Sequence, residues 1–214
     1  MEEIYNSLYS YFGPRNWWPA KTPFEMIVGA ILTQAVAWRN VQKAIKNLED
    51  AGLLTPEGLY RAEPERIEEL VKPTRYYRMK TKKLKAFVEY LFSKHQGDLA
   101  RMFSLPLPEL REELLRVHGM GEETVDSILL YAGEHPIFVV DEYTRRIFSR
   151  LGVFPEKISY GKMQEFFHNH LPHDAGLFNE FHAQIDALGN HICKTNPDCT
   201  QCPVEKICLR AKSQ

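Results

Sequence analysis

The sequence is short of cysteine, and the cysteines it has are confined to one region. Of 214 residues only four are cysteine, and all four lie between positions 193 and 208. This distribution excludes a disulfide framework spread along the chain. The N-terminus also lacks the charged start and apolar core of a secretory signal, so we expect a cytoplasmic protein.

Long hydrophobic runs are also missing. The longest candidate, Phe24–Leu32, contains Glu25 and is followed by Thr33 and Gln34. It falls short of the roughly 18 apolar residues that a membrane helix needs, so we expect no membrane association. The hydrophobic content of 44% is enough for a substantial core, and the composition therefore predicts a folded, soluble protein.

Net charge is nearly absent, at −1. A protein with this balance cannot hold nucleic acid by bulk positive charge and must use a local patch or backbone donors. One stretch has that character, because seven cations and no acid lie between Lys72 and Val88, with Tyr76 and Tyr77 among them. On its own the stretch fits a solvated helix face equally well. The seven cations are Lys72, Arg75, Arg78, Lys80, Lys82, Lys83 and Lys85.

Strand alternation is absent as well, and helical periodicity takes its place. Apolar residues recur at three- and four-residue spacing between Gly, Pro and Asn breaks, which predicts an all-α protein. The only extended run, Pro136–Val140, is too short for a sheet and reads as a buried connector before Asp141. The predicted helices lie near residues 2–12, 23–34, 38–50, 64–71, 79–94, 107–117, 122–132, 141–151, 161–170 and 175–191.

The four cysteines have the spacing of a metal site. They follow the pattern Cys193-x5-Cys199-x2-Cys202-x5-Cys208. Two disulfides would be crowded into about sixteen residues, and tetrahedral zinc usually takes two close pairs where this sequence has one. An iron–sulfur cluster needs four thiolates spread more widely, which a tight pair with two outlying cysteines provides. The spacing therefore favours a cluster, with zinc and free thiols as the alternatives.

A glycine hairpin separates two predicted helices. The first ends near Val117, the segment His118-Gly119-Met120-Gly121 interrupts it, and the second begins at Glu122. Such a turn leaves backbone N–H groups at the start of the second helix, where they suit a phosphate. Taken alone, the segment also fits a plain corner between two helices.

Three segments together carry a specific resemblance. Residues 114–125, residues 138–146 and the four cysteines follow one another as in the helix-hairpin-helix DNA glycosylases of the endonuclease III superfamily. The likeness covers nearly the whole chain. Ile31-Leu32-Thr33-Gln34 is similar to the motif on an early helix of that family, whose Gln enters the space vacated by a flipped base. The resemblance implies DNA contacts by Gln34, Gly119, Met120 and Gly121.

The resemblance also implies the organisation of the chain. It predicts a two-lobed all-α fold, with a six-helix barrel over residues 21–130 and a second lobe formed by residues 1–20 and 131–214. The second lobe would carry a [4Fe-4S] cluster held by Cys193, Cys199, Cys202 and Cys208. The partner it implies is double-stranded DNA containing damaged bases, bound by a monomer.

Asp141 and Glu123 define the chemistry that the resemblance implies. Hydrolysis of an N-glycosidic bond builds positive charge on the sugar, and a carboxylate near the anomeric carbon stabilises it. Asp141 occupies that position in the family pattern, although an Asp there also suits a helix cap. The lysine of bifunctional relatives falls at Glu123, which cannot form an imine, so we expect a monofunctional enzyme. Two further departures are the five-residue first cysteine gap, where six is usual, and His118, where Pro is common.

The base pocket is predicted from the tryptophans. Trp17 and Trp18 precede Pro19, and Trp38 lies four residues after Gln34. This arrangement is similar to the 3-methyladenine glycosylase branch of the superfamily, whose aromatic faces sandwich the flipped base. Stacked indoles attract a cationic alkylated purine by about 0.5–2 kcal/mol. The alternative is that the adjacent tryptophans only fill the hydrophobic core.

Other functions remain open at this point. Within the same fold, the enzyme would remove uracil or thymine from mismatches, or adenine opposite a damaged guanine. From other classes, a non-catalytic helix-hairpin-helix DNA-binding protein and an electron carrier using the cluster fit part of the pattern. Glu180, His182 and Asp186 fall on one predicted helix, and we expect them to be structural.

Overall fold

All regular structure is helical in the computed structural model, which describes residues 1–212. No strand occurs within these residues, so the predicted all-α class is confirmed. The chain divides into two compact units. The central unit comprises residues 18–135, and the terminal unit combines residues 1–17 with the chain from residue 136 onward.

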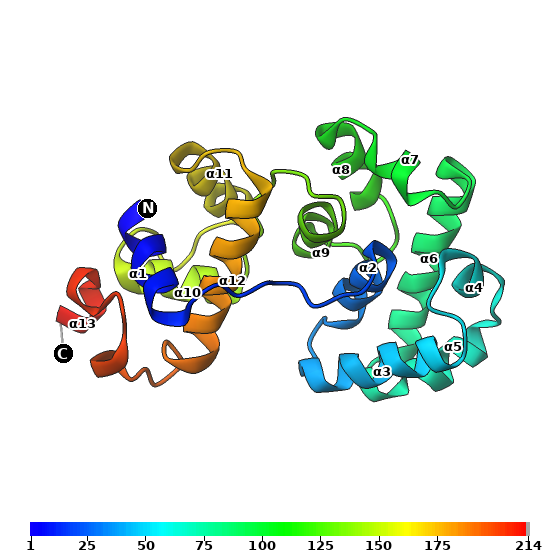
Figure 1. Ribbon diagram of the computed structural model, residues 1–214, viewed down its shortest axis with the longest axis horizontal. Coiled ribbons are helices and arrows are strands. Elements are labelled where there is room, and N and C mark those ends of the chain that lie inside the picture. The colour runs from blue at the N-terminus through cyan, green and yellow to red at the C-terminus, as the bar shows by residue number, and fades with distance from the viewer. Residues whose placement is uncertain (213–214) are drawn as a thin grey trace. The chain divides into compact units, whose positions relative to one another are not determined.

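The central unit contains the helices that follow α1, from α2 to α9 (Figure 1). They are α2 (Pro23–Leu32), α3 (Trp38–Asp50), α4 (Pro56–Arg61), α5 (Pro64–Val71), the 3₁₀ turn η1 (Lys72–Thr74), α6 (Tyr77–His95), α7 (Leu99–Phe103), α8 (Leu107–Leu115) and α9 (Glu122–Ser127), which continues as the π-helical turn η2 (Ile128–Ala132).

The terminal unit contains the first helix and the last four. They are α1 (Glu2–Phe12), α10 (Glu142–Leu151), α11 (Tyr160–His170), α12 (Ala175–His191) and α13 (Leu209–Lys212), with 3₁₀ turns at Cys199–Gln201 and Glu205–Ile207 between α12 and α13. Helix α12 packs against both α1 and α10. The first helix therefore packs in the same unit as the helices that follow residue 136.

Helix α2 is the core of the central unit. Thr22 caps its N-terminus by accepting a hydrogen bond from the Glu25 backbone, and Pro23 occupies the first helical position, where a missing N–H costs nothing. Nearly all of the helix is buried, and it packs against α3, α6 and the turn η2. Despite this apolar character, none of the helices within residues 1–212 is long and apolar enough to cross a membrane.

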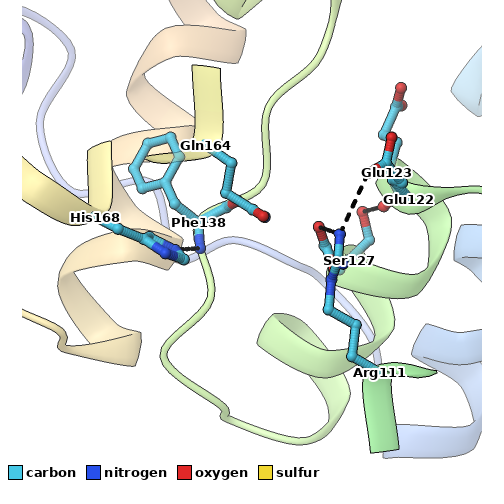
Figure 2. A network of polar contacts seen from close by, with 8 residues as sticks. Arg111, Glu122, Glu123, Ser127, Phe138, Gln164 and His168 are labelled. Carbon is cyan, nitrogen blue, oxygen red and sulfur yellow. Dashed lines mark hydrogen bonds and ion pairs between the residues drawn. The ribbon is translucent and has the colours of Figure 1, made fainter. Parts of the chain in front are cut away.

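The extended connector before Asp141 is buried, as predicted. Residues 137–140 are each at most 3% exposed and form no regular structure. Both backbone groups of Phe138 are held by α11: its N–H donates to His168 Nε2 at 2.9 Å, and its carbonyl accepts from Gln164 Nε2 at 2.8 Å (Figure 2). The Phe138 ring stacks on the Phe167 ring, with the ring centroids 3.9 Å apart. These contacts fix the chain three residues ahead of Asp141.

Candidate active site and hairpin

Asp141 is the N-cap of α10, as its sequence position predicted. Its Oδ1 accepts hydrogen bonds from the backbone N and the hydroxyl Oγ1 of Thr144, at 2.7 and 2.8 Å. Both bonds end on the same oxygen, so the cap fixes the carboxylate and turns Oδ2 toward other partners. The side chain is 17% exposed, and Oδ2 lies 3.9 Å from Nε2 of His182 on α12.

His182 and Asp186 therefore belong to the surroundings of Asp141. Burial raises the pKa of the Asp186 carboxyl, and the Asp141 charge raises it further, whereas His182 lowers it. Asn190 Nδ2 donates to Asp186 Oδ2 at 2.9 Å, and Tyr143 donates to Asn190 Oδ1 at 2.7 Å. From the sequence we expected His182 and Asp186 to be structural, and their grouping with Asp141 was not predicted, because the contacts depend on α10 packing against α12.

Glu180, on the same helix, has the structural role expected of it. The Arg15 backbone N–H donates a bifurcated hydrogen bond to the two carboxylate oxygens of Glu180, with N···O distances of 3.0 and 3.2 Å. The carboxylate also accepts from Gln184 Nε2 at 2.6 Å. These bonds tie the segment after α1 to α12.

The hairpin between α8 and α9 depends on one of its two glycines. Gly119 has φ +80°, and a Cβ at this position would lie 2.5 Å from Lys83 Cγ, so backbone angle and packing both require glycine. A Cβ on Gly121 would meet nothing within 4 Å. Met120 is 7% exposed and its N–H donates to the Val117 carbonyl. The turn itself therefore uses the Met120 backbone donor.

A partly buried ion pair joins the two hairpin helices. Arg111 of α8 donates from Nε and Nη2 to both carboxylate oxygens of Asp126 in α9, at 2.7 and 3.1 Å. Asp126 is fully buried, and Glu122 Oε1 lies 3.7 Å from Arg111 Nη2 (Figure 2). Figure 2 also places Glu123 on the first turn of α9, where its carbonyl accepts from Ser127 Oγ. The position that the resemblance matches to the lysine of bifunctional enzymes is thus in the first turn of this helix.

Gln34 lies beside the hairpin. It belongs to the turn between α2 and α3, where Ala35 adopts a positive φ of 53° that is unfavourable for a residue with a side chain. Gln34 Nε2 donates to Thr124 Oγ1 of α9 at 2.8 Å, and its Oε1 accepts from Lys83 Nζ. The structure thus brings together Gln34 and the hairpin, which the sequence analysis identified separately.

The basic stretch divides into buried and exposed cations. Lys80 is 3% exposed and donates to the carbonyls of Leu32 and Thr74, and its burial lowers its pKa to about 8. Lys85 donates to the Tyr60 carbonyl at 2.7 Å. Neither the solvated face nor the DNA patch describes the whole stretch. The exposed cations are Lys72, Arg75, Arg78 and Lys82.

Two of the three tryptophans meet in the central unit. The Trp18 and Trp38 rings contact edge to face, with centroids 5.1 Å apart at 86°, and Tyr131 lies 5.6 Å from Trp18. Because the indoles already touch, no base fits between them in this arrangement, and a base would stack on an outer face. Trp17 belongs to the terminal unit.

The four cysteines line one small pocket between α10, the end of α12 and the C-terminal turns. All four are free of disulfide bonds. Arg150 Nη1 donates to Cys193 Sγ at 3.2 Å, and Cys208 Sγ donates to the Arg150 carbonyl at 3.3 Å. Arg150 therefore connects the first and last cysteine.

The thiols of this pocket do not gather around a single point. Within residues 1–212 no three His, Cys, Asp or Glu side chains converge closely enough to hold one metal ion. A cubane cluster occupies the space between more widely separated thiolates. Burial raises the pKa of the Cys202 thiol to about 11, so the neutral thiol is the favoured form of this side chain at neutral pH.

These features define an all-helical protein of the helix-hairpin-helix class, with a capped aspartate at the start of the helix that follows a buried connector. The HhH-GPD superfamily of base excision DNA repair proteins matches residues 28–173, and the chain belongs to this superfamily.

Several known proteins are similar to this chain in sequence or in structure. A Methanocaldococcus jannaschii protein, provisionally named a DNA repair glycosylase, is 41% identical over 97% of this chain and 94% of its own length. The structure of the H. pylori 3-methyladenine DNA glycosylase MagIII bound to 1,N6-ethenoadenine has a TM-score of 0.77 and 27% identity, covering 87% of this chain and 95% of that one. A trapped endonuclease III–DNA covalent intermediate has a TM-score of 0.85 at 21% identity, covering 99% and 95%, which shows a common fold. The predicted helix-hairpin-helix fold is confirmed.

Proposed function

We propose that this protein is a monofunctional DNA glycosylase that hydrolyses the N-glycosidic bond of alkylated purines such as 3-methyladenine in double-stranded DNA. The observation that carries the proposal is the geometry of Asp141. Its Oδ1 is anchored by Thr144, so the carboxylate charge is held in place before any substrate binds. Preorganised charge of this kind contributes most when positive charge develops in the transition state.

The reaction follows from that charge. The damaged nucleotide leaves the base stack, and its C1′–N bond breaks with the electron pair moving to the base. The sugar becomes positively charged, and the Asp141 carboxylate stabilises it and orients the water that adds to C1′. The proton of the water passes to the carboxylate or to solvent. The product is an abasic site in an intact strand.

The absence of strand cleavage is proposed from Glu123. β-Elimination at an abasic site proceeds through an imine with an amine of the enzyme. The position that supplies this amine in bifunctional relatives is a carboxylate here. We therefore assign base release alone to this protein.

The substrate class is proposed from the aromatic residues and from one relative. An indole face attracts a cationic base, and Trp18, Trp38 and Tyr131 form one cluster, with Trp17 adjacent in the sequence. The H. pylori relative, at 27% identity, is a 3-methyladenine DNA glycosylase. A positively charged purine is also a good leaving group, so the site needs little acid catalysis.

The four cysteines are proposed to hold a [4Fe-4S] cluster. When bound, the cluster cross-links the loop after α12 through its thiolate bonds and takes no part in the hydrolysis. Cys193, Cys199, Cys202 and Cys208 would be the ligands, and their common pocket supports this assignment. Arg146 holds the start of the loop independently, because its Nε donates to the Cys193 carbonyl at 2.8 Å.

A panel of duplexes tests the proposal. Each duplex carries one lesion: 3-methyladenine, uracil opposite guanine, thymine opposite guanine, or adenine opposite 8-oxoguanine. We expect release of the alkylated purine, detected as strand scission after alkali treatment, and no scission without alkali. Release only from the uracil or thymine mismatch would overturn the substrate class. Binding without release from any duplex would favour a non-catalytic DNA-binding protein.

A further inference from the structure

Lys83 lies at the junction of the two features that the sequence analysis assigned to DNA contact. It projects from the middle of α6, and its ammonium donates to Gln34 Oε1. Its methylene chain passes beneath the hairpin, because a Cβ on Gly119 would lie 2.5 Å from Lys83 Cγ and 2.7 Å from Cε. Burial lowers the pKa of Lys83. The residue is thus partly enclosed by the turn that it supports.

The hydrogen-bonding capacity of the Lys83 ammonium determines how the Gln34 amide is oriented. An ammonium group has three donors and no acceptor, so only the amide oxygen can face it. The amide nitrogen then points to Thr124 Oγ1, 2.8 Å away. A flipped amide would place its NH₂ group against the ammonium, where no hydrogen bond can form. After these two bonds, one N–H and one oxygen lone pair of Gln34 remain for a further partner, in fixed positions.

We propose that Lys83 is a positioning residue that holds the Gln34 amide in one orientation and so determines which base opposite the lesion is accepted. The inference rests on the proposed function, because it takes Gln34 to enter the space left by the flipped base. A fixed donor and a fixed acceptor match the edge of some orphaned bases and not others. An amide free to rotate by half a turn would exchange the two groups and lose that distinction.

A direct contact between Lys83 and a DNA phosphate is the rival explanation, and it has a different signature. A lysine that neutralises a phosphate releases a counterion, so its loss weakens binding to every sequence and reduces the salt slope by about 1. A lysine that acts through Gln34 leaves the salt slope unchanged and alters the relative affinities for different opposite bases.

The experiment measures binding and needs no catalysis. Four duplexes carry a tetrahydrofuran abasic analogue opposite A, C, G or T, and fluorescence anisotropy gives the Kd of each at several salt concentrations. The wild-type protein should bind the four with different affinities. In Lys83→Met the ratio between the weakest and the tightest of the four Kd values should fall about tenfold, or about 1.4 kcal/mol at 25 °C. The salt slope should not change. Lys82→Met, at the exposed neighbouring position, should keep the spread.

Two further variants keep the test decisive. Lys83→Arg retains a cationic donor and should restore most of the spread, which separates positioning from loss of folding. In a Gln34→Ala background, Lys83→Met should change the four affinities no further. Equal wild-type affinities, or a uniform loss with a smaller salt slope in Lys83→Met, would overturn the proposal. Intact discrimination without release of any damaged base would instead count against the proposed glycosylase activity.

Discussion

Replacement of Asp141 by Asn separates the two roles of this side chain. The Asn carbonyl oxygen can still accept both hydrogen bonds from Thr144, so the cap of α10 survives. Asn and Asp are about equally good N-caps, and we expect the free energy of unfolding to change by less than about 0.5 kcal/mol. The negative charge is lost. Removal of such preorganised electrostatics lowers the rate about 10²–10³-fold, or about 2.7–4 kcal/mol in the barrier.

Single-turnover release of 3-methyladenine measures the rate, and anisotropy with an abasic duplex measures binding. We expect the rate to fall by this factor while binding is retained, because the charge acts mainly on the transition state.

Asp174→Asn is the matched control, because Asp174 caps α12 in the same way and accepts from the Leu177 N–H at 2.7 Å. Its release rate should equal that of the wild type. Asp141→Ala should lose the cap as well and unfold about 1 kcal/mol more easily. Near-normal release by Asp141→Asn would refute the catalytic assignment.

Three other predictions address the substrate, the lyase reaction and the cysteines. Trp38→Ala should lower the rate of 3-methyladenine release much more than it weakens binding to an abasic duplex, because an abasic site presents no base to stack. Equal losses in both assays would contradict the assignment of Trp38 to the base pocket. Borohydride should fail to trap the wild-type protein on damaged DNA, since Glu123 offers no amine, and efficient trapping would reveal another lysine in that role. Cys202→Ala should lose iron, measured by absorbance at about 400 nm. The same variant should bind DNA more weakly. Stoichiometric zinc in anaerobically purified wild-type protein would contradict the cluster.

The long helices were predictable from the sequence because their apolar residues recur at a regular three- and four-residue spacing. Each predicted segment of eight or more residues corresponds to a helix with closely similar bounds. The helices that it missed are α4, α7 and α13, of six, five and four residues. A segment of one or two turns presents too few apolar positions to establish a period.

The candidate site was predictable where it is local. The cap formed by Asp141 involves residues three apart, and an Asp before a helical segment predicts it directly. The contacts of Gln34 join residues 49 and 90 positions apart, and no local pattern indicates them. The basic character of residues 72–88 likewise does not show which of their side chains point into the core and which point into solvent. Lys80 and Lys82 lie two residues apart in one basic run, yet the first is buried and the second exposed, because successive helical positions point about 100° apart.

The acid at position 123 also affects the hairpin itself. Glu122 and Glu123 both lie in the first turn of α9, where the helix dipole favours negative charge by about 0.3–1 kcal/mol per group. A lysine at position 123 would reverse the sign of that contribution. The same carboxylates repel a phosphate, because Glu122 and Glu123 stand at the helix end whose backbone N–H groups would otherwise attract an anion. A carboxylate at position 123 therefore stabilises α9 and makes this turn less attractive to a phosphate than a lysine at the same position would.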